Sequence, residues 1–281
     1  EKVPPPMASS KSEKKRKKKK KKAPPDKHVL YQESVQNADY EVANFKKIYK
    51  KLRGKSPRHL REDFCGTALI SCAWVRKIKE GTAQGVDIDA PTLAWGRERN
   101  VAPLGDLAAR VELLNCDVLE AREPAADVIA AVNFSYFVFK QRSRLLDYFR
   151  AARASLATDG VLILDIYGGP DAQTLQVEDT RYDDFTYVWD QDKYNPITGE
   201  TVCHIHFRLA SGKTMKKAFT YDWRLWSLPE VRDALLDAGF REVTVFWEGT
   251  DKRTGEGNSI YRVSTKGDNA TSWIAYVAAT A

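Results

Sequence analysis

The chain of 281 residues has only four cysteines, Cys65, Cys72, Cys116 and Cys203. No two of them have the Cys-x-x-Cys spacing of a metal site, and they form no compact disulfide framework, so we expect free thiols and a reducing compartment. The sequence also lacks an apolar run of the roughly twenty residues that cross a membrane and the apolar core of a secretory signal. These absences predict a soluble intracellular protein without a membrane span. We expect it in the cytoplasm or, if the basic segment described next is a targeting signal, in the nucleus.

The excess of positive charge is confined to the N-terminal segment. Residues 1–30 hold 12 of the 45 basic and 3 of the 38 acidic residues, which leaves 33 basic and 35 acidic residues in the rest of the chain. The nearly continuous basic run from Lys11 to Lys22 repels itself and has nothing to bury, so we predict a disordered tail over residues 1–27. This tail is either a solubilising segment, a nuclear-localisation signal or an electrostatic arm for RNA or another polyanion. The near-neutral remainder gives no sign of a basic groove.

After the tail, apolar patterning predicts helices that alternate with strands. Residues 28–56 contain a helix over Ala38–Leu52, and this unit either folds over a ligand as a lid, with Tyr31 in contact, or packs on the sheet edge. Five strands are expected at 58–63, 83–88, 111–115, 127–133 and 161–167, with helices at 68–79, 91–100 and 142–156 between them. Such alternation predicts an α/β fold over residues 57–281 with a doubly wound, mostly parallel sheet.

The period of the pattern changes after the fifth strand. Residues 185–189, 201–209 and 215–223 alternate as strands do, so we predict an antiparallel β insertion over residues 184–226. A helix at 229–238 and two further strands, 242–248 and 273–277, complete a seven-stranded main sheet. We expect those last two strands to pair as a hairpin at the sheet edge. The polar, glycine-rich loop 249–258 between them is expected to be mobile.

Five short motifs follow the strands of the parallel half. At the end of the first strand, Glu62-Asp-Phe-Cys-Gly-Thr-Ala68 turns at Gly66 and opens a helix, which is the entry to a nucleotide-binding βαβ unit. Gly85-Val-Asp87 ends the second strand, where an acid can accept hydrogen bonds from ribose hydroxyls. The other three motifs are Cys116-Asp117 after the third strand, Asn133-Phe-Ser-Tyr136 after the fourth and Leu156-Ala-Thr-Asp-Gly160 before the fifth.

In this order and at these separations, the motifs of residues 57–167 resemble the core of class I S-adenosylmethionine-dependent methyltransferases. The resemblance implies a Rossmann-like sheet, S-adenosyl-L-methionine as the cofactor and methyl transfer by in-line displacement. The sequence departs from the family pattern at Phe64 and Ala68, which stand where the usual turn has its first and last glycines. Phe64 would crowd the pyrophosphate of a dinucleotide, whereas S-adenosylmethionine has no phosphate, so the departure argues against NAD.

The resemblance also implies roles for individual residues. Glu62 or Asp63 and the turn backbone would hold the methionine end, and Asp87 would bind the ribose. The implied cofactor-binding set is Tyr31, Glu62, Asp63, Cys65, Gly66, Thr67, Asp87, Ile88, Asp117, Val118, Asn133 and Phe134, with Ile88, Asp117 and Val118 around the adenine and Asn133 and Phe134 beside the sulfonium. As alternatives, Asp117 caps the segment that follows it, Asp63 lies outside the site, and Phe134 belongs to the core.

The methyl acceptor is expected over the ends of the fourth and fifth strands, roofed by the aromatic insertion. The candidate substrate residues are Tyr136, Tyr167, Trp189, His204, His206, Tyr221, Trp223 and Glu248. Tyr167, His204 and His206 are also candidate bases, needed only if the nucleophile arrives protonated. The two histidines share a strand face but lack a third ligand, so no metal site is predicted. The alternative is that the aromatic residues form an ordinary subdomain core or an oligomer interface.

An aromatic-lined pocket in a near-neutral body favours a small-molecule acceptor. One alternative is an RNA or protein-lysine methyltransferase recruited by the basic tail. An alternative of another class is a non-catalytic scaffold of the same fold that binds polyanions.

Overall fold

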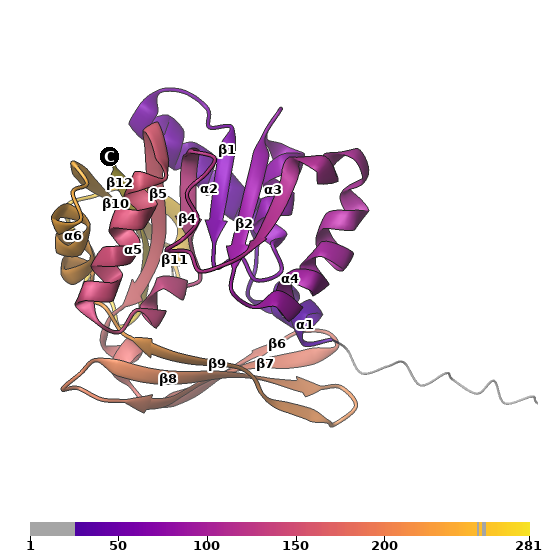
Figure 1. Cartoon of the computed structure of the whole chain (residues 1–281). Coiled ribbons are helices and arrows are strands. Elements are labelled where there is room, and N and C mark those ends of the chain that lie inside the picture. The colour runs from indigo at the N-terminus through magenta and orange to yellow at the C-terminus, as the bar shows by residue number, and fades with distance from the viewer. Residues whose placement is uncertain (1–25, 252, 255–256) are drawn as a thin grey trace, which may run out of the picture.

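The computed structural model describes residues 26–281 except Lys252, Gly255 and Glu256, so the predicted tail lies almost wholly outside the described residues. Two sheets organise the molecule (Figure 1). The strands of the main sheet are β1 (His59–Asp63), β2 (Thr82–Asp87), β3 (Val111–Asn115), β4 (Ala126–Ala131), β5 (Leu156–Gly168), β10 (Glu242–Thr250), β11 (Gly257–Val263) and β12 (Trp273–Thr280). Those of the second sheet are β6 (Gln176–Arg181), β7 (Phe185–Tyr194), β8 (Glu200–Leu209) and β9 (Thr214–Arg224).

The main sheet is mixed and mostly parallel. Among the described residues it has eight strands in the order β11-β10-β12-β5-β4-β1-β2-β3. The five strands from β5 to β3 run parallel, whereas β12, β10 and β11 are antiparallel to their neighbours. The predicted doubly wound, Rossmann-like α/β fold with an antiparallel insertion after strand five is therefore confirmed.

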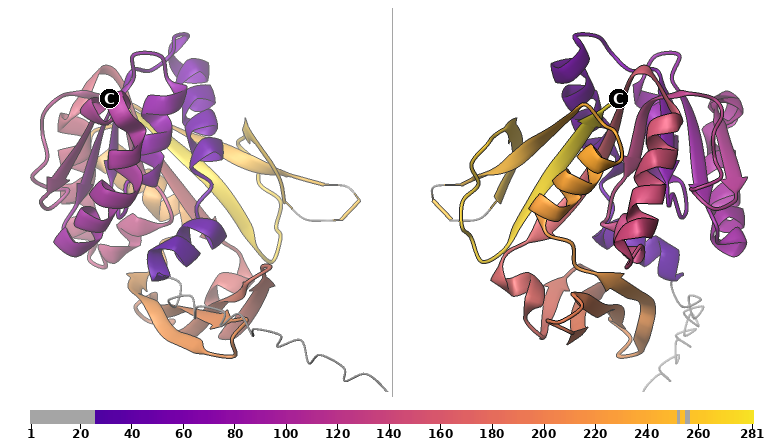
Figure 2. Two further views of the ribbon diagram at one scale, coloured as in Figure 1. Left: turned by 90° about the vertical axis from the view of Figure 1, so that its right-hand side faces the viewer. Right: turned by 60° about the vertical axis from the view of Figure 1, so that its left-hand side comes forward.

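The antiparallel end of this sheet differs from the prediction. An eighth strand, β11, begins within the segment 249–258 that was predicted as a mobile loop, and it pairs with β10. Figure 2 shows this β10–β11 hairpin extending away from the body. β12 does pair with β10, but it lies inside the sheet between β10 and β5, not at the edge. The sequence of β11, Gly-Asn-Ser-Ile-Tyr-Arg-Val, has no strict apolar alternation, and this is why it was not recognised.

Helices cover both faces of the main sheet. They are α1 (Lys27–Ser34), α2 (Ala38–Arg53), α3 (Leu69–Lys77), α4 (Ala90–Gly96), α5 (Arg142–Ala154) and α6 (Leu228–Asp237). Helices α2 and α3 pack on one face with Val128 and Ala130 of β4, while α5 and α6 pack on the other with Ile129 and Ala131. This strict alternation along a strand buried on both sides explains the continuous apolar run in its sequence.

Some element boundaries differ from the predicted ones. Helix α4 is shorter than predicted and continues as a π-helical turn (Arg97–Val101) and a 3-10 segment (Ala102–Arg110), since Pro103 and Gly105, at φ +59°, interrupt a regular helix. Short 3-10 turns also occupy Ser135–Val138 and Pro170–Gln173. The predicted turn before strand five lies inside β5, where the register with β4 shifts between Ala126 and Val128.

The second sheet spans residues 176–224, compared with the predicted 184–226. Its first strand, β6, was missed because its residues are mostly polar and exposed and show no apolar period. Figure 1 shows this sheet lying across the carboxyl ends of the parallel strands, with α1 between it and α4. The carboxyl edge of the main sheet is where ligands bind in open α/β folds, so the insertion roofs the expected site. None of the helices in the described part of the chain combines the length and apolar character that crossing a bilayer requires.

Candidate functional site

The turn after β1 holds three residues in the left-handed region of backbone space. Gly66 has φ +53°, and the two non-glycine residues Phe64 and Ala68 have φ +57° and +56°. A left-handed conformation costs a non-glycine residue about 1–2 kcal/mol, so the surroundings must hold this turn. Two short backbone hydrogen bonds do so, from Cys65 N to Val86 O at 3.0 Å and from Ala68 N to Cys65 O at 2.8 Å. These hydrogen bonds fix the backbone groups of the turn in place.

Asp87, at the end of β2, is tied directly to this turn. Its Oδ2 accepts a hydrogen bond from Gly66 N at 2.7 Å, and its Oδ1 accepts one from Asp89 N at 2.9 Å. The Asn115 amide donates to the carbonyl groups of Asp87 and Ile88 at 3.1 and 2.9 Å. The half-buried carboxylate keeps unused lone pairs for a ligand. The loops after β1, β2 and β3 are therefore fixed relative to one another at the sheet's switch point between β1 and β4.

A cavity of about 300 Å³, here called the glycine-loop cavity, opens above these loops. Its walls come from helix α1, the loops after β1, β2 and β4, and strand β9. They comprise His28, Tyr31, Gln36, Phe64, Cys65, Gly66, Thr67, Asp87, Asp89, Thr92, Asn133, Ser135, Phe219, Tyr221 and Trp223.

Helix α1 closes this cavity on one side. Gln32 Nε2 donates to Thr67 Oγ1 at 2.7 Å, and Trp95 Nε1 of α4 donates to Asp26 Oδ2, the N-cap of α1, at 2.8 Å. The Tyr31 ring lies 4.8 Å from that of Phe219 on β9. Helix α1 thus connects the glycine turn, α4 and the insertion. In the predicted unit 28–56, α1 occupies the lid position and α2 packs on the sheet.

A second cavity of about 320 Å³, the aromatic cavity, lies next to the first. It is enclosed by α1, the ends of β4 and β5, the turn after β5 and the inner face of the second sheet. Its lining residues are Tyr31, Val35, Asn133, Phe134, Tyr167, Asp171, Ala172, Gln176, Glu178, Tyr187, Trp189, Gln191, Ile205, Tyr221, Trp223, Ser272 and Ile274. The two cavities share one wall, made of Tyr31, Asn133, Tyr221 and Trp223.

The shared wall is held in place from below by Asp165. Its carboxylate accepts hydrogen bonds from Asn133 N at 2.7 Å and Phe134 N at 2.9 Å. Both of those residues have positive φ, +56° and +58°. Burial raises the pKa of Asp165 to about 8. Above Asn133, the Tyr221 and Trp223 rings stack with centroids 4.4 Å apart. A strained backbone and a stacked ring pair therefore meet at the boundary between the cavities.

The geometry can be compared with known proteins. No protein-family model and no curated protein matches the sequence. Solved structures do match: an S-adenosylmethionine-dependent methyltransferase from Clostridium acetobutylicum superposes with a TM-score of 0.64 at 15% identity, over 90% of this chain and 96% of that one. CalS10, an amino pentose methyltransferase from Micromonospora echinaspora with S-adenosylmethionine bound, gives 0.61 at 15% identity over 89% and 95%. The sugar N-methyltransferase KedS8 from a Streptoalloteichus species gives 0.60 at 14% identity over 97% of both chains.

This chain has the class I methyltransferase fold. Of the residues predicted for the cofactor, Tyr31, Cys65, Gly66, Thr67, Asp87 and Asn133 line the glycine-loop cavity. Phe134 lines the aromatic cavity instead. Ile88 projects from the loop after β2 with 75% of its surface exposed, so an apolar face is free for a ligand beside Asp87.

The two acids of the first methyltransferase motif point elsewhere. The buried Glu62 carboxylate caps helix α3, accepting from Ser71 N at 2.8 Å and Ser71 Oγ at 2.5 Å, and burial raises its pKa to about 7. Asp63 lies in a buried ion pair with Arg61, with Nε and Oδ1 2.8 Å apart, and it accepts from the Tyr148 hydroxyl at 2.9 Å. Both carboxylates therefore bind other parts of the protein. The residues of this motif that line the cavity belong to the turn that follows them.

The residues of the third motif are also used locally. Asp117 Oδ1 accepts from Leu119 N at 2.9 Å and so caps its own turn, the alternative noted from the sequence. Val118 is buried in the core that contains α5 and α6. An adenine contact by either residue remains a proposal.

Four predicted acceptor residues, Tyr167, Trp189, Tyr221 and Trp223, line the aromatic cavity. The histidines do not fit the predicted base role. Along β8, Ile205 faces the cavity, whereas the adjacent His204 and His206 point to the opposite face of the sheet. His204 Nε2 lies 3.2 Å from Asp192 Oδ2, and His206 Nε2 lies 3.1 Å from Asp190 Oδ2. The alternation of side chains along a strand correctly placed both histidines on one face of the sheet. That face points away from the aromatic cavity.

Two further acceptor candidates are also displaced. Tyr136 is fully buried among α5 core residues. Glu248 belongs to the projecting β10–β11 hairpin, where its carboxylate accepts from Ser259 N at 2.7 Å. Neither position adjoins the aromatic cavity.

Sequence reasoning missed several lining residues. Ser135 lies inside a recognised motif, and Asp89 and Thr92 follow the Gly85-Val-Asp87 motif closely, so adjacency could have found them. Phe219 shares the period-two face of Tyr221 and Trp223. His28 carried no signal of its own: it enters the site because α1 folds back over the cavity, and burial lowers its pKa.

Proposed function

We propose that this protein is an S-adenosylmethionine-dependent methyltransferase that binds its cofactor in the glycine-loop cavity and a small-molecule acceptor in the aromatic cavity. The observation that carries the proposal is the wall of four residues that the two cavities share. Methyl transfer needs donor and acceptor in line and shielded from water, and two adjoining cavities roofed by one insertion supply that arrangement.

The residues of the glycine-loop cavity fit the cofactor. Asp87 offers lone pairs to ribose hydroxyls, the exposed Ile88 offers an apolar face to adenine, and the turn at Gly66 allows close backbone approach. The cofactor supplies an activated methyl group on a sulfonium. Asn133 and the stacked pair of Tyr221 and Trp223 would stand beside this cation, which aromatic faces and carbonyl oxygens stabilise.

The aromatic cavity favours an amine as acceptor. Its rings include Tyr187 and Trp189, and two carboxylates, Asp171 and Glu178, also line it. An alkylamine is protonated at neutral pH, so aromatic faces and carboxylates attract it. It must lose a proton before it can attack, and the same carboxylates can accept that proton. The name of KedS8, a sugar N-methyltransferase, supports a nitrogen acceptor, and the name of CalS10, an amino pentose methyltransferase, supports an amine-bearing one.

Two alternatives involve the tail Lys11 to Lys22, which lies outside the described residues. In one, the tail recruits RNA or a lysine-containing protein as the acceptor. In the other, the fold is a non-catalytic scaffold that binds polyanions. Deleting residues 1–25 tests both, because a small-amine methyltransferase keeps its turnover without the tail.

The first experiment is calorimetric titration of the full chain with S-adenosylmethionine and S-adenosylhomocysteine. We expect both to bind. A panel of small primary and secondary amines, phenols and lysine peptides is then assayed for release of S-adenosylhomocysteine, with amines expected to react. A folded protein that binds neither nucleoside would refute the proposed function.

A further inference from the structure

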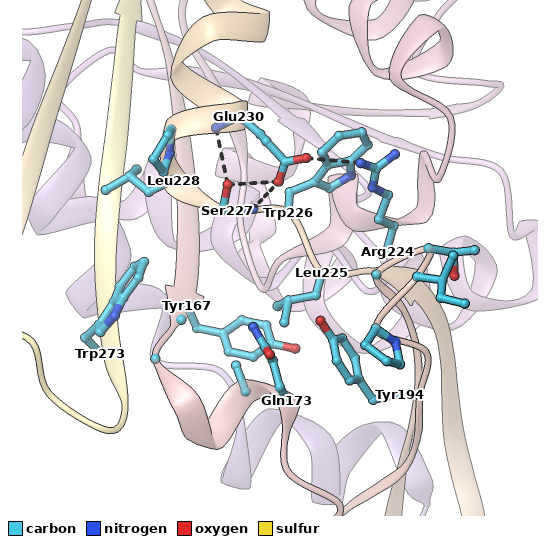
Figure 3. A pocket seen from close by; sticks show the side chains of 18 residues that line it. Tyr167, Gln173, Tyr194, Arg224, Leu225, Trp226, Ser227, Leu228, Glu230 and Trp273 are labelled. Carbon is cyan, nitrogen blue, oxygen red and sulfur yellow. Dashed lines mark hydrogen bonds and ion pairs between the residues drawn. The ribbon is translucent and has the colours of Figure 1, made fainter.

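A third cavity, of about 370 Å³, lies beyond the aromatic cavity. We call it the hairpin cavity, because the β7–β8 turn, residues 194–199, forms one of its sides, with the turn after β5 and the start of α6 as the others (Figure 3). It shares Tyr167 and Ala172 with the aromatic cavity. Among the described residues, none lines both the hairpin cavity and the glycine-loop cavity. The three cavities therefore follow one another, with the aromatic cavity in the middle.

The charged groups of the hairpin cavity are already paired. Among its described lining residues only Arg224 and Glu230 carry charge. Arg224 Nη2 donates to Glu230 Oε1 at 3.0 Å, and its guanidinium lies 3.7 Å from the centroid of the Trp226 ring. Glu230 also accepts from Ser227 in the capping box of α6, which satisfies that helix end. No free charge is left among these residues for an ionic ligand.

Several neutral polar groups of this cavity, by contrast, have no hydrogen-bond partner among the described residues. They include the hydroxyls of Tyr167 and Tyr194 and the side-chain amide of Gln173. The Tyr167 oxygen is buried without a hydrogen-bond partner in the described part of the chain, and burial raises the pKa of this phenol, so it stays a donor at neutral pH. Figure 3 shows the polar ends of all three side chains directed into the same space.

The remaining surface of the cavity is apolar and aromatic. Leu225 and Trp273 line it. Ile197, in the β7–β8 turn, also lines this cavity and has 93% of its surface exposed. A flat ring can lie against such side chains while its polar substituents reach the three free groups.

We propose that the hairpin cavity binds the part of the acceptor remote from the reacting atom, and that this part is a neutral ring bearing hydroxyl or amide groups. The inference rests on the proposed function, because it places the reacting atom in the aromatic cavity. Neutral hydrogen-bonding substituents match the free groups, whereas an ionic ligand would have to break the pair of Arg224 and Glu230. Tyr167, at the boundary, contacts both parts of the acceptor.

The test uses the full chain saturated with S-adenosylhomocysteine. Methyl β-D-glucopyranoside and 2-piperidone serve as probes of a hydroxylated ring and an amide-bearing ring, with glucose 6-phosphate as the charged comparison. Binding is measured by ligand-observed NMR titration on the wild type, Gln173→Ala, Tyr194→Phe and the double variant. Gln141→Ala, at the exposed N-cap residue of α5 outside the three cavities, is the matched control, because the Gln141 side chain makes no capping hydrogen bond. Thermal unfolding verifies that each variant is folded.

We expect at least one neutral ring to bind, more tightly than glucose 6-phosphate. Each single variant should weaken binding about five-fold, the factor expected for one lost hydrogen bond, and Gln141→Ala should leave it unchanged. Glucoside or lactam binding alone would support the inference and identify the substituent. If S-adenosylhomocysteine binds but neither ring does, or if the double variant binds both rings like the wild type, the inference is overturned and the proposed function stands. A folded protein that fails to bind S-adenosylhomocysteine would overturn the proposed function itself.

Discussion

The glycine-loop cavity and the aromatic cavity adjoin but are built in different ways. The first consists largely of backbone groups in short loops at the ends of neighbouring parallel strands, locked by contacts such as Gly66 N to Asp87 Oδ2 at 2.7 Å. The second consists of side chains from α1, β5 and the second sheet, segments far apart in sequence. The first cavity therefore depends on local sequence at the strand ends, whereas the second depends on how distant segments pack.

Buried acidic residues lie beneath both cavities. Under the glycine turn, Asp63 pairs with Arg61 and Glu62 caps α3. Under the shared wall, Asp165 holds two residues with positive φ. In both places a buried carboxylate acts on the backbone rather than on a ligand. Substitution of these supporting acids should therefore affect stability, whereas substitution of the residues that line the cavities should affect binding.

The largest effect is expected at the buried ion pair. Arg61→Ala leaves Asp63 charged and uncompensated, which typically costs about 3–5 kcal/mol. Urea denaturation should show this loss, while molecules that remain folded keep their affinity for S-adenosylhomocysteine. The double variant Arg61→Met/Asp63→Leu should be less destabilised, because it removes both charges. If a folded Asp63→Asn variant no longer binds S-adenosylhomocysteine, Asp63 belongs to the cofactor site.

Asp87→Ala tests the lining of the glycine-loop cavity. Loss of the carboxylate leaves ribose hydroxyls and Gly66 N without their acceptor, so cofactor binding should weaken by roughly 1–3 kcal/mol. Calorimetric titration measures this change, with Asp106→Ala, at an exposed acid outside the cavities, as the control. Equal affinity of Asp87→Ala and the wild type would contradict the assigned role.

Trp189→Ala should produce the opposite pattern. Trp189 lines the aromatic cavity but not the glycine-loop cavity. The affinity for S-adenosylhomocysteine should therefore stay within about two-fold of the wild-type value. By contrast, kcat/KM for the best amine should fall about ten-fold or more. His206→Gln, on the outer face of the same sheet, should behave like the wild type. A large loss of kcat in His206→Gln would restore the histidine as a candidate base.

The smallest effect concerns pH. Burial raises the pKa of Glu41 on α2 to about 7, although its carboxylate accepts from the Tyr276 hydroxyl at 2.7 Å. An unfolded glutamate has a pKa of about 4.3, so the folded state favours the protonated form. The stability from this group is present below about pH 4 and is lost as the pH rises through about 7. Chemical denaturation between pH 5.5 and 8.5 should therefore show a smaller decline for Glu41→Gln than for the wild type, and equal slopes would exclude Glu41 as a source.

Much of the first cavity could be predicted because its chemistry is local. Gly66, Asp87 and Asn133 each end or follow a strand of the parallel sheet, and parallel strands bring their carboxyl ends to one edge. The second cavity was predicted only as a region. Period two divides β8 into two faces, but it does not say which face turns inward, so the histidines were assigned to the wrong one. Strands β6 and β11 escaped recognition because their residues are largely polar, and backbone pairing, not burial, holds them.

The sequence by itself determined the alternating α/β order, the antiparallel insertion and the motif residues at the strand ends, because these follow from short-range periodicity and turn chemistry. Only the tertiary structure decided that α1 folds over the glycine turn, that Glu62 and Asp63 support the scaffold, and that three cavities adjoin in order. The physical reason is that such contacts join segments far apart in the sequence, such as Tyr31 on α1 and Phe219 on β9. Their formation depends on packing of the whole chain, which no local pattern records.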